Sequence, residues 1–207
     1  MVKTVTAGSR LVVYAGSGSN STILTGIADT SGRTWTLQQS IAIAAFSTAY
    51  VWTSNPVVST GSITVTVTAN NTSDDWGADL LEFGGSAGIG ASSKTNVTSG
   101  APTLNITTTG ANSAIAVINM DINAVSGASR VWRTNAGAFT EQTFSQATGV
   151  IGAYGGFHAN AGAIGTYAVG LSAPTGMKYS IIACEVLGTV TAAGKSPGNI
   201  TQYGSFI

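Results

Sequence analysis

Short runs of β-branched and aromatic residues, separated by clusters of Gly, Ser and Asn, recur along the whole chain. The clearest run is ITVTVT at residues 63–68, in which apolar residues alternate strictly with threonine. A period of two predicts a β-strand with one buried face, and threonine on the other face also favours extended backbone. The same pattern predicts strands at residues 11–14, 34–37, 104–107, 114–118, 166–171 and 180–187.

Helical patterns are weak throughout the sequence. No segment of a dozen residues combines a 3.6-residue period with capping residues. The Ala-rich residues 40–50 are compatible with a helix in isolation, but their β-branched and aromatic flanks favour a strand at least equally. Regularly spaced strands without helices predict a β-sandwich or a β-barrel.

The two halves of the chain resemble each other. The matching features are Tyr50 and Tyr154, Gly61 and Gly162, and Glu82 and Glu185. We therefore expect an all-β, antiparallel, jelly-roll-like sandwich over residues 1–188, with similar halves at about 1–90 and 100–188. Two tandem small sandwiches are the alternative, and residues 84–100 offer the one candidate boundary. The matched positions of the two glutamates indicate a structural role at strand ends.

The C-terminal residues 189–207 differ from the rest, since Gly194, Pro197 and other breakers prevent regular structure. They nevertheless end in the apolar residues Tyr203, Phe206 and Ile207. We expect an extended arm that docks on a neighbouring subunit through these three side chains.

Charge is scarce in this sequence. Only 8% of the 207 residues are charged, against about 25% in an ordinary domain, and eight basic residues balance eight acidic ones. An uncharged surface favours association, so we expect a homo-oligomer. The absence of a basic cluster argues against nucleic-acid binding, and no apolar run is long enough for membrane insertion. Cys184 lies in an apolar run and is expected to be buried and inert.

Two segments imitate catalytic motifs. Residues 84–88 match G-x-S-x-G around Ser86, with Asp121 and His158 following in the order of an α/β-hydrolase triad. That motif needs a helix directly after the serine, and a Gly- and Ser-rich stretch follows instead. Residues 188–196 resemble a P-loop but have one residue too many between the glycines. We therefore expect no catalytic residue and no cofactor, and an enzyme is the least favoured function.

Metal binding also has little support. Asp74, Asp75 and Asp79 cluster between two strands, where calcium sites occur, but their spacing matches no EF-hand. His158 is the only histidine, so a transition-metal site lacks a second nitrogen ligand. We expect no metal site.

Aromatic residues offer a second type of binding. Trp76 lies in an acidic loop and Trp132 lies between two arginines, so both are candidates for stacking on a sugar ring. Trp35 and Trp52 fall within strand patterns and are expected in the core. If all four were core or interface residues, no glycan site would exist.

A longer series of motifs indicates a family. The series comprises GSRLVV at residues 8–13, GIADTSGRTWTL at 26–37, YVW at 50–52, Gly61 with its alternating strand, and LEFG at 81–84. It resembles, over residues 5–190, a jelly-roll-like structural module of many tailed-bacteriophage virion proteins and some bacterial surface proteins. Arg33 and Phe83 depart from this pattern, where Asn and Tyr are usual.

The resemblance implies a structural protein of a phage virion, either a tail or fibre component or a capsid decoration protein. It implies no active site. Together with the low charge, it leads us to expect a homo-oligomer, a trimer, that contacts other virion proteins. A carbohydrate-binding module that recognises host or cell-surface glycans is the alternative.

Overall fold

A computed structural model describes residues 1–17, 23–43, 47–71, 76–121, 130–147 and 151–188. These residues form antiparallel strands and no helix. The strands of the first half are β1 (Val2–Val5), β2 (Arg10–Ser17), β3 (Leu24–Asp29), β4 (Trp35–Ile43), β5 (Ser47–Ser54), β6 (Gly61–Ala69) and β7 (Trp76–Phe83). Those of the second are β8 (Gly88–Gly100), β9 (Thr103–Thr107), β10 (Ala114–Asp121), β11 (Val131–Trp132), β12 (Phe139–Ala147), β13 (Ile151–His158), β14 (Thr166–Ala173) and β15 (Met177–Leu187).

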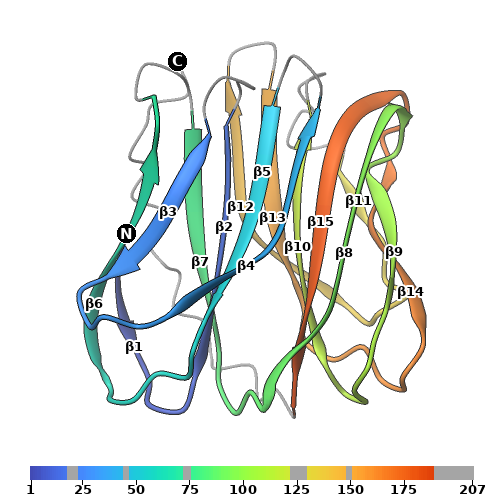
Figure 1. The fold of residues 1–207 in the computed structure, drawn as a ribbon. Helices are drawn as coiled ribbons and strands as arrows, with labels where there is room; N and C mark the ends of the chain where they lie inside the picture. Colours follow the sequence, from blue (N-terminus) through green and yellow to red (C-terminus); the bar gives the residue numbers. More distant parts are fainter. Residues whose placement is uncertain (18–22, 44–46, 72–75, 122–129, 148–150, 189–207) are drawn as a thin grey trace.

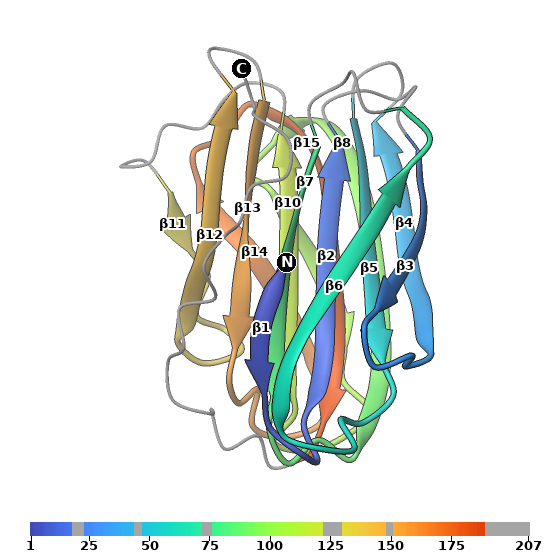
Figure 2. The same cartoon turned by 90° about the vertical axis from the view of Figure 1, so that its left-hand side faces the viewer.

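The strands form four sheets stacked in layers (Figure 1). The first outer sheet has the order β1-β6-β3 and covers the first inner sheet, β4-β5-β2-β7. The second inner sheet, β12-β13-β10-β15-β8, is covered in turn by the second outer sheet, β11-β14-β9. The two inner sheets pack face to face, and Figure 2 shows the molecule with the first outer sheet, β1-β6-β3, in front.

The predicted all-β, antiparallel sandwich is confirmed. Each run predicted as a strand lies within an observed strand or overlaps it, and the described residues 40–43 and 47–50 belong to β4 and β5 rather than to a helix. A jelly roll has two facing sheets, whereas the described residues form four, so the jelly-roll detail is not confirmed. The stretch expected to separate the halves contains β8, a strand of 13 residues that pairs with β15.

The second half repeats the strand order of the first. The order β4-β5-β2-β7 corresponds to β12-β13-β10-β15, and β1-β6-β3 corresponds to β9-β14-β11. Even the β-bulges coincide, because the register shifts at Gln38 in β4 and at Gln142 in β12, 104 positions apart. β8 is the one described strand without a counterpart in the first half.

The matched glutamates bind equivalent turns. Glu82 accepts hydrogen bonds from the Thr6 amide (2.6 Å) and the Ser9 hydroxyl (2.8 Å), in the turn before β2. Glu185 accepts from the amides of Thr109 and Gly110, in the turn before β10. In both turns a serine hydroxyl also donates to the carbonyl three residues earlier. The predicted structural role of these two residues is therefore confirmed.

The contact between the inner sheets is apolar and close. Buried side chains from β2, β5 and β7 meet buried side chains from β10 and β15, among them Cys184, which is buried as predicted. The sheets approach closely at Gly16, where an added Cβ would lie 2.6 Å from the sulfur of Met120 and the Met120 side chain would have to shift. Each inner sheet is thus covered on both faces, which explains its nearly continuous apolar strands.

Replacing Glu185 with alanine should lower the free energy of unfolding by about 3 kcal/mol, because buried amides lose a charged acceptor. Glu82→Ala should cost less, since Glu82 accepts fewer hydrogen bonds. Urea unfolding of both variants measures the difference. Equal losses would contradict the unequal bonding of the two turns.

The Glu185 contribution should depend on pH. Burial alone would raise the pKa of Glu185, but the amides of Ala91, Gly110 and Thr109 and the Ser113 hydroxyl lower it below its ordinary value. The stabilisation is therefore fully present above the unfolded-state pKa of about 4.3 and is lost as the pH falls through the folded-state pKa. Wild type and Glu185→Ala should converge in stability only at the acidic end of this range.

Candidate functional site along strand β7

The edge strand β7 is the place where the two halves differ. In the second half β15 pairs with β10 on one side and with β8 on the other. In the first half β7 pairs with β2, and no described strand pairs with its other edge. Two cavities lie beside β7, one on each face of the strand.

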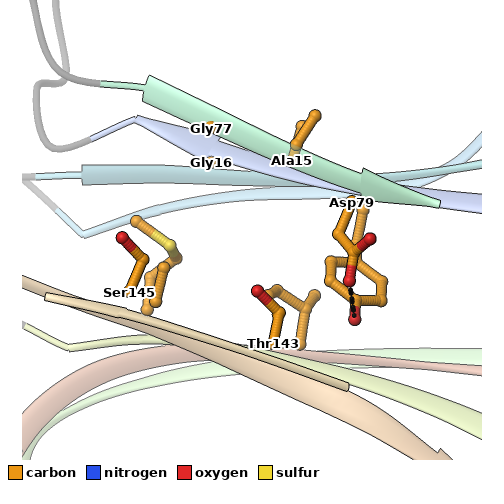
Figure 3. Close-up of a pocket in the computed structure, with 11 residues that line it drawn as sticks. Ala15, Gly16, Gly77, Asp79, Thr143 and Ser145 are labelled. Atoms are coloured by element: carbon orange, nitrogen blue, oxygen red, sulfur yellow. Dashed lines mark hydrogen bonds between the residues drawn. The ribbon is translucent and has the colours of Figure 1, made fainter. Parts of the chain in front are cut away.

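The first cavity, of about 40 Å³, lies between the two inner sheets and is called the inter-sheet cavity here. Its lining includes Tyr14, Gly16, Asp79, Met120, Thr143 and Ser145. Figure 3 shows Asp79 projecting from the first inner sheet, with Thr143 and Ser145 on the opposite sheet. The volume corresponds to a group of only a few atoms.

Asp79 gives this cavity its polar character. Its Oδ2 accepts a hydrogen bond from the Tyr14 hydroxyl at 2.9 Å, and its Oδ1 accepts one from the Leu80 amide at 2.7 Å. Burial raises the pKa of Asp79 above its ordinary value, although these two donors oppose the shift. Burial and the neighbouring Asp79 charge likewise raise the pKa of Tyr14 well above its ordinary value. The pair can therefore hold a proton or accept a donor from a small polar group.

The second cavity, called the β6–β7 groove, has a volume of about 330 Å³. Met1, Val65 and Val67 line it from the outer sheet, and Trp76 and Ala78 line it from β7. Its walls are mainly apolar and belong to the core between the first two sheets, or pack against that core. The groove is large enough for one or two apolar side chains.

The backbone of β6 is open beside this groove. β1 pairs with β6 from Gly61 to Thr64, and Met1 then exchanges two hydrogen bonds of 2.7 Å with Val65. Backbone direction alternates along a strand, so Val67 directs its N–H and C=O toward the same side as Val65. No described strand pairs with Val67 on that side. This edge can accept an added strand.

The two tryptophans predicted to stack on sugars lie in different surroundings. Trp76 is half-buried and lines the β6–β7 groove. Trp132 stacks on Phe139 with ring centroids 3.7 Å apart, and its Nε1 donates to Glu141. Arg130 forms an ion pair with the same Glu141 carboxylate. Of the strand-pattern tryptophans, Trp52 is buried as predicted and Trp35 is half-buried.

The triad-like residues do not come together. Asp121 pairs with Gly152, whereas His158 pairs with Ile115, so the two lie at opposite ends of the β10–β13 ladder, about 20 Å apart. His158 is buried, with its Nδ1 2.9 Å from the Gly137 carbonyl oxygen, and burial lowers its pKa. The Ser86 hydroxyl donates to the Gly88 carbonyl in a turn that leads into β8 rather than into a helix.

Several predicted residues lie outside the described part of the chain: Asp74, Asp75, Tyr203, Phe206, Ile207 and the P-loop-like residues after Gly188. Within the described part, no three His, Cys, Asp or Glu side chains gather closely enough to hold a metal ion. The same residues include no helix that is long and apolar enough to cross a membrane.

Sequence reasoning missed the edge of β7 that no described strand covers and the half-buried position of Asp79 beside the inter-sheet cavity. The sequence DLLEF at residues 79–83 predicts a strand but not its neighbours. The exposure of the Asp79 side chain depends on those neighbours, which lie far away in the sequence. No protein-family model, no curated protein and no solved structure matches this chain. The site must therefore be interpreted from its own geometry.

Asp79→Asn should be more stable than the wild type at pH 7. A raised folded-state pKa means that ionisation of Asp79 is penalised in the folded protein, and this penalty grows as the pH rises through that pKa. Below the ordinary value of about 3.9 the advantage of the variant should vanish. Denaturant midpoints at pH 3.5 and pH 7 measure both effects, and lower stability of the variant at pH 7 would contradict a net penalty for the Asp79 charge.

Proposed function

We propose that this chain is a structural protein of a phage virion, a tail or fibre component or a capsid decoration protein, that acts through protein–protein assembly. The proposal has two sources of support: the sequence resemblance described above, and the chemistry of the surface. It assigns the chain no catalytic role. Its partners are further copies of itself and other virion proteins, without nucleic acid or a membrane.

The uncharged, partly apolar surface is the observation that carries the proposal. The 207-residue chain has sixteen charged side chains, and its formal net charge is zero. Large apolar side chains are exposed instead, and Val58 is 90% and Ile164 is 61% accessible. The other exposed members in the described residues are Val2, Ile23, Leu37 and Val131. Such a surface favours stable protein–protein contacts over a monomer in solution.

The wild-type protein should form a stable homo-oligomer, with a trimer as the expected state. Light scattering should then give three times the 20.7 kDa chain mass, and Val58→Glu should reduce that mass if Val58 lies in a contact. Asn105→Glu serves as a control, because Asn105 is exposed, already polar and distant from the β6–β7 groove in the fold. A stable monomer that does not bind to phage particles would contradict the proposal.

Glycan binding is a second candidate, and the position of Trp76 favours it. The indole lines the β6–β7 groove and is the better placed of the two tryptophans, because Phe139 covers one face of Trp132. Trp76→Ala should then abolish binding on a glycan array, while Trp132→Ala should affect stability more than binding. Equal binding by the wild type and Trp76→Ala would exclude this site.

A further inference from the structure

The second half shows what occupies the position beside β7 that no described strand fills. There β8 pairs with β15 from Leu187 to Met177. Its Ile89 packs toward the middle of the molecule, and its Ala91 and Val97 pack toward the outer core. Val97 lies opposite Tyr179, the counterpart of Trp76, and packs against the outer core, so its side chain takes the place that corresponds to the β6–β7 groove.

The segment after β8 also covers the edge of the outer sheet. The carbonyl of Pro102 accepts a hydrogen bond of 2.6 Å from the Leu171 amide in β14. Leu171 corresponds to Val67 of β6, 104 positions earlier, whose backbone faces the β6–β7 groove. An extended segment with a free carbonyl is therefore the chemical type of ligand that this groove fits.

The sequence contains a second segment of this type. Asn96-Val97-Thr98 in β8 matches Asn199-Ile200-Thr201 in the arm, at a spacing of 103 residues. Glu82 and Glu185 are separated by the same 103 residues. The arm, residues 189–207, therefore follows β15 in the sequence as β8 follows β7, with the matching residues at equal distances from the two glutamates.

The end of β15 lies next to the connection between β7 and β8. The Ala87 amide donates to the Leu187 carbonyl at 2.8 Å, and a Cβ on Gly188 would lie 2.8 Å from the Gly85 carbonyl oxygen. The connections that follow β7 and β15 thus touch each other. From Gly85 to Val97 and from Gly188 to Ile200 the chain has twelve steps in each case, so the arm can reach its own β7 as β8 reaches β15.

The packing between the inner sheets follows the same internal repeat as the strand order. β4 lies over β15 and β8, and Asn96 of β8 donates to the Ala42 carbonyl of β4 at 2.8 Å. On the other side, β7 lies across the inter-sheet cavity from Thr143 and Ser145 of β12, the counterpart of β4. A strand added to β7 would face β12 as β8 faces β4.

We propose that residues 199–205 of the same chain form a strand on the free edge of β7 and close the β6–β7 groove. In the register of β8, Asn199 lies opposite Gly77, and Ile200 lies opposite Trp76 with its side chain in the groove. Residues 203–205 take the position of Gly100–Pro102, beside Val67. Pro197 and Gly198 stand where β8 has Lys94 and Thr95, so the pairing begins at Asn199.

This inference does not rest on the proposed function. Its observations are a free strand edge, an apolar groove and an internal repeat, and all of them concern one chain. The short covalent connection makes pairing within the chain more favourable than capture of an arm from a second copy. Exchange between copies would give a swapped oligomer and is an outcome that the test must separate.

A disulfide between Gly77→Cys and Asn199→Cys tests the register. Residues opposite each other in an antiparallel pair have Cα atoms about 4.5–5.5 Å apart, which suits a disulfide. Mild oxidation of the dilute double variant should join these two cysteines within one chain, which then migrates as a single chain on a denaturing, non-reducing gel. Gly26→Cys with Asn199→Cys is the control, because Gly26 lies on β3 at the opposite edge of the outer sheet and has open space around it. Cys184 is buried and should not react.

The outcomes are distinct. A disulfide that forms only between copies, detected by mixing the two single variants, would overturn the assignment to the same chain. Equal cross-linking in the control, or none in either variant, would overturn the strand itself. The oligomeric mass of the wild type, which tests the proposed function, does not enter these results.

Hydrogen exchange supplies a second readout. Ile200→Asp should increase exchange at the β7 and β6 amides beside the groove, because a charge cannot enter the apolar groove. Thr201→Asp should leave those amides unchanged, since this residue points to the other face of the same strand. Equal protection in both variants would contradict the proposal.

Discussion

The face-to-face contact of the two inner sheets is the interaction on which the rest of the structure depends. Each inner sheet already covers the core of its own outer sheet, so its second face must be buried as well. Small side chains make this possible, above all Gly16 against Met120. The contact joins two halves of similar topology, and each described strand of the first half has a counterpart in the second.

The equivalence is imperfect at one strand, and the cavities follow from this difference. β8 covers the edge of β15, while the described residues supply no such strand for β7. Where no described strand lies beside β7, there is space on both faces of the strand, with half-buried Asp79 on one side and half-buried Trp76 on the other. Both candidate sites are therefore consequences of a single topological feature.

The sequence predicted the strands and the repeat well, because alternation and matched residues such as Glu82 and Glu185 are local features. It did not predict four sheets, since the number of layers depends on which faces meet. The candidate boundary at residues 84–100 contains β8, because Gly- and Ser-rich segments resemble linkers until a partner strand is known. The half-buried position of Asp79 could not be predicted either, since it depends on strands that are distant in sequence.

The central contact has a consequence for how such a fold can exist. A half-length chain would present the apolar face of one inner sheet to water, including residues equivalent to Val12, Val51 and Leu81. It could cover that face only by pairing with a second half-length chain. The 207-residue polypeptide thus has the architecture of a two-fold homodimer whose subunits are joined by the connection between β7 and β8.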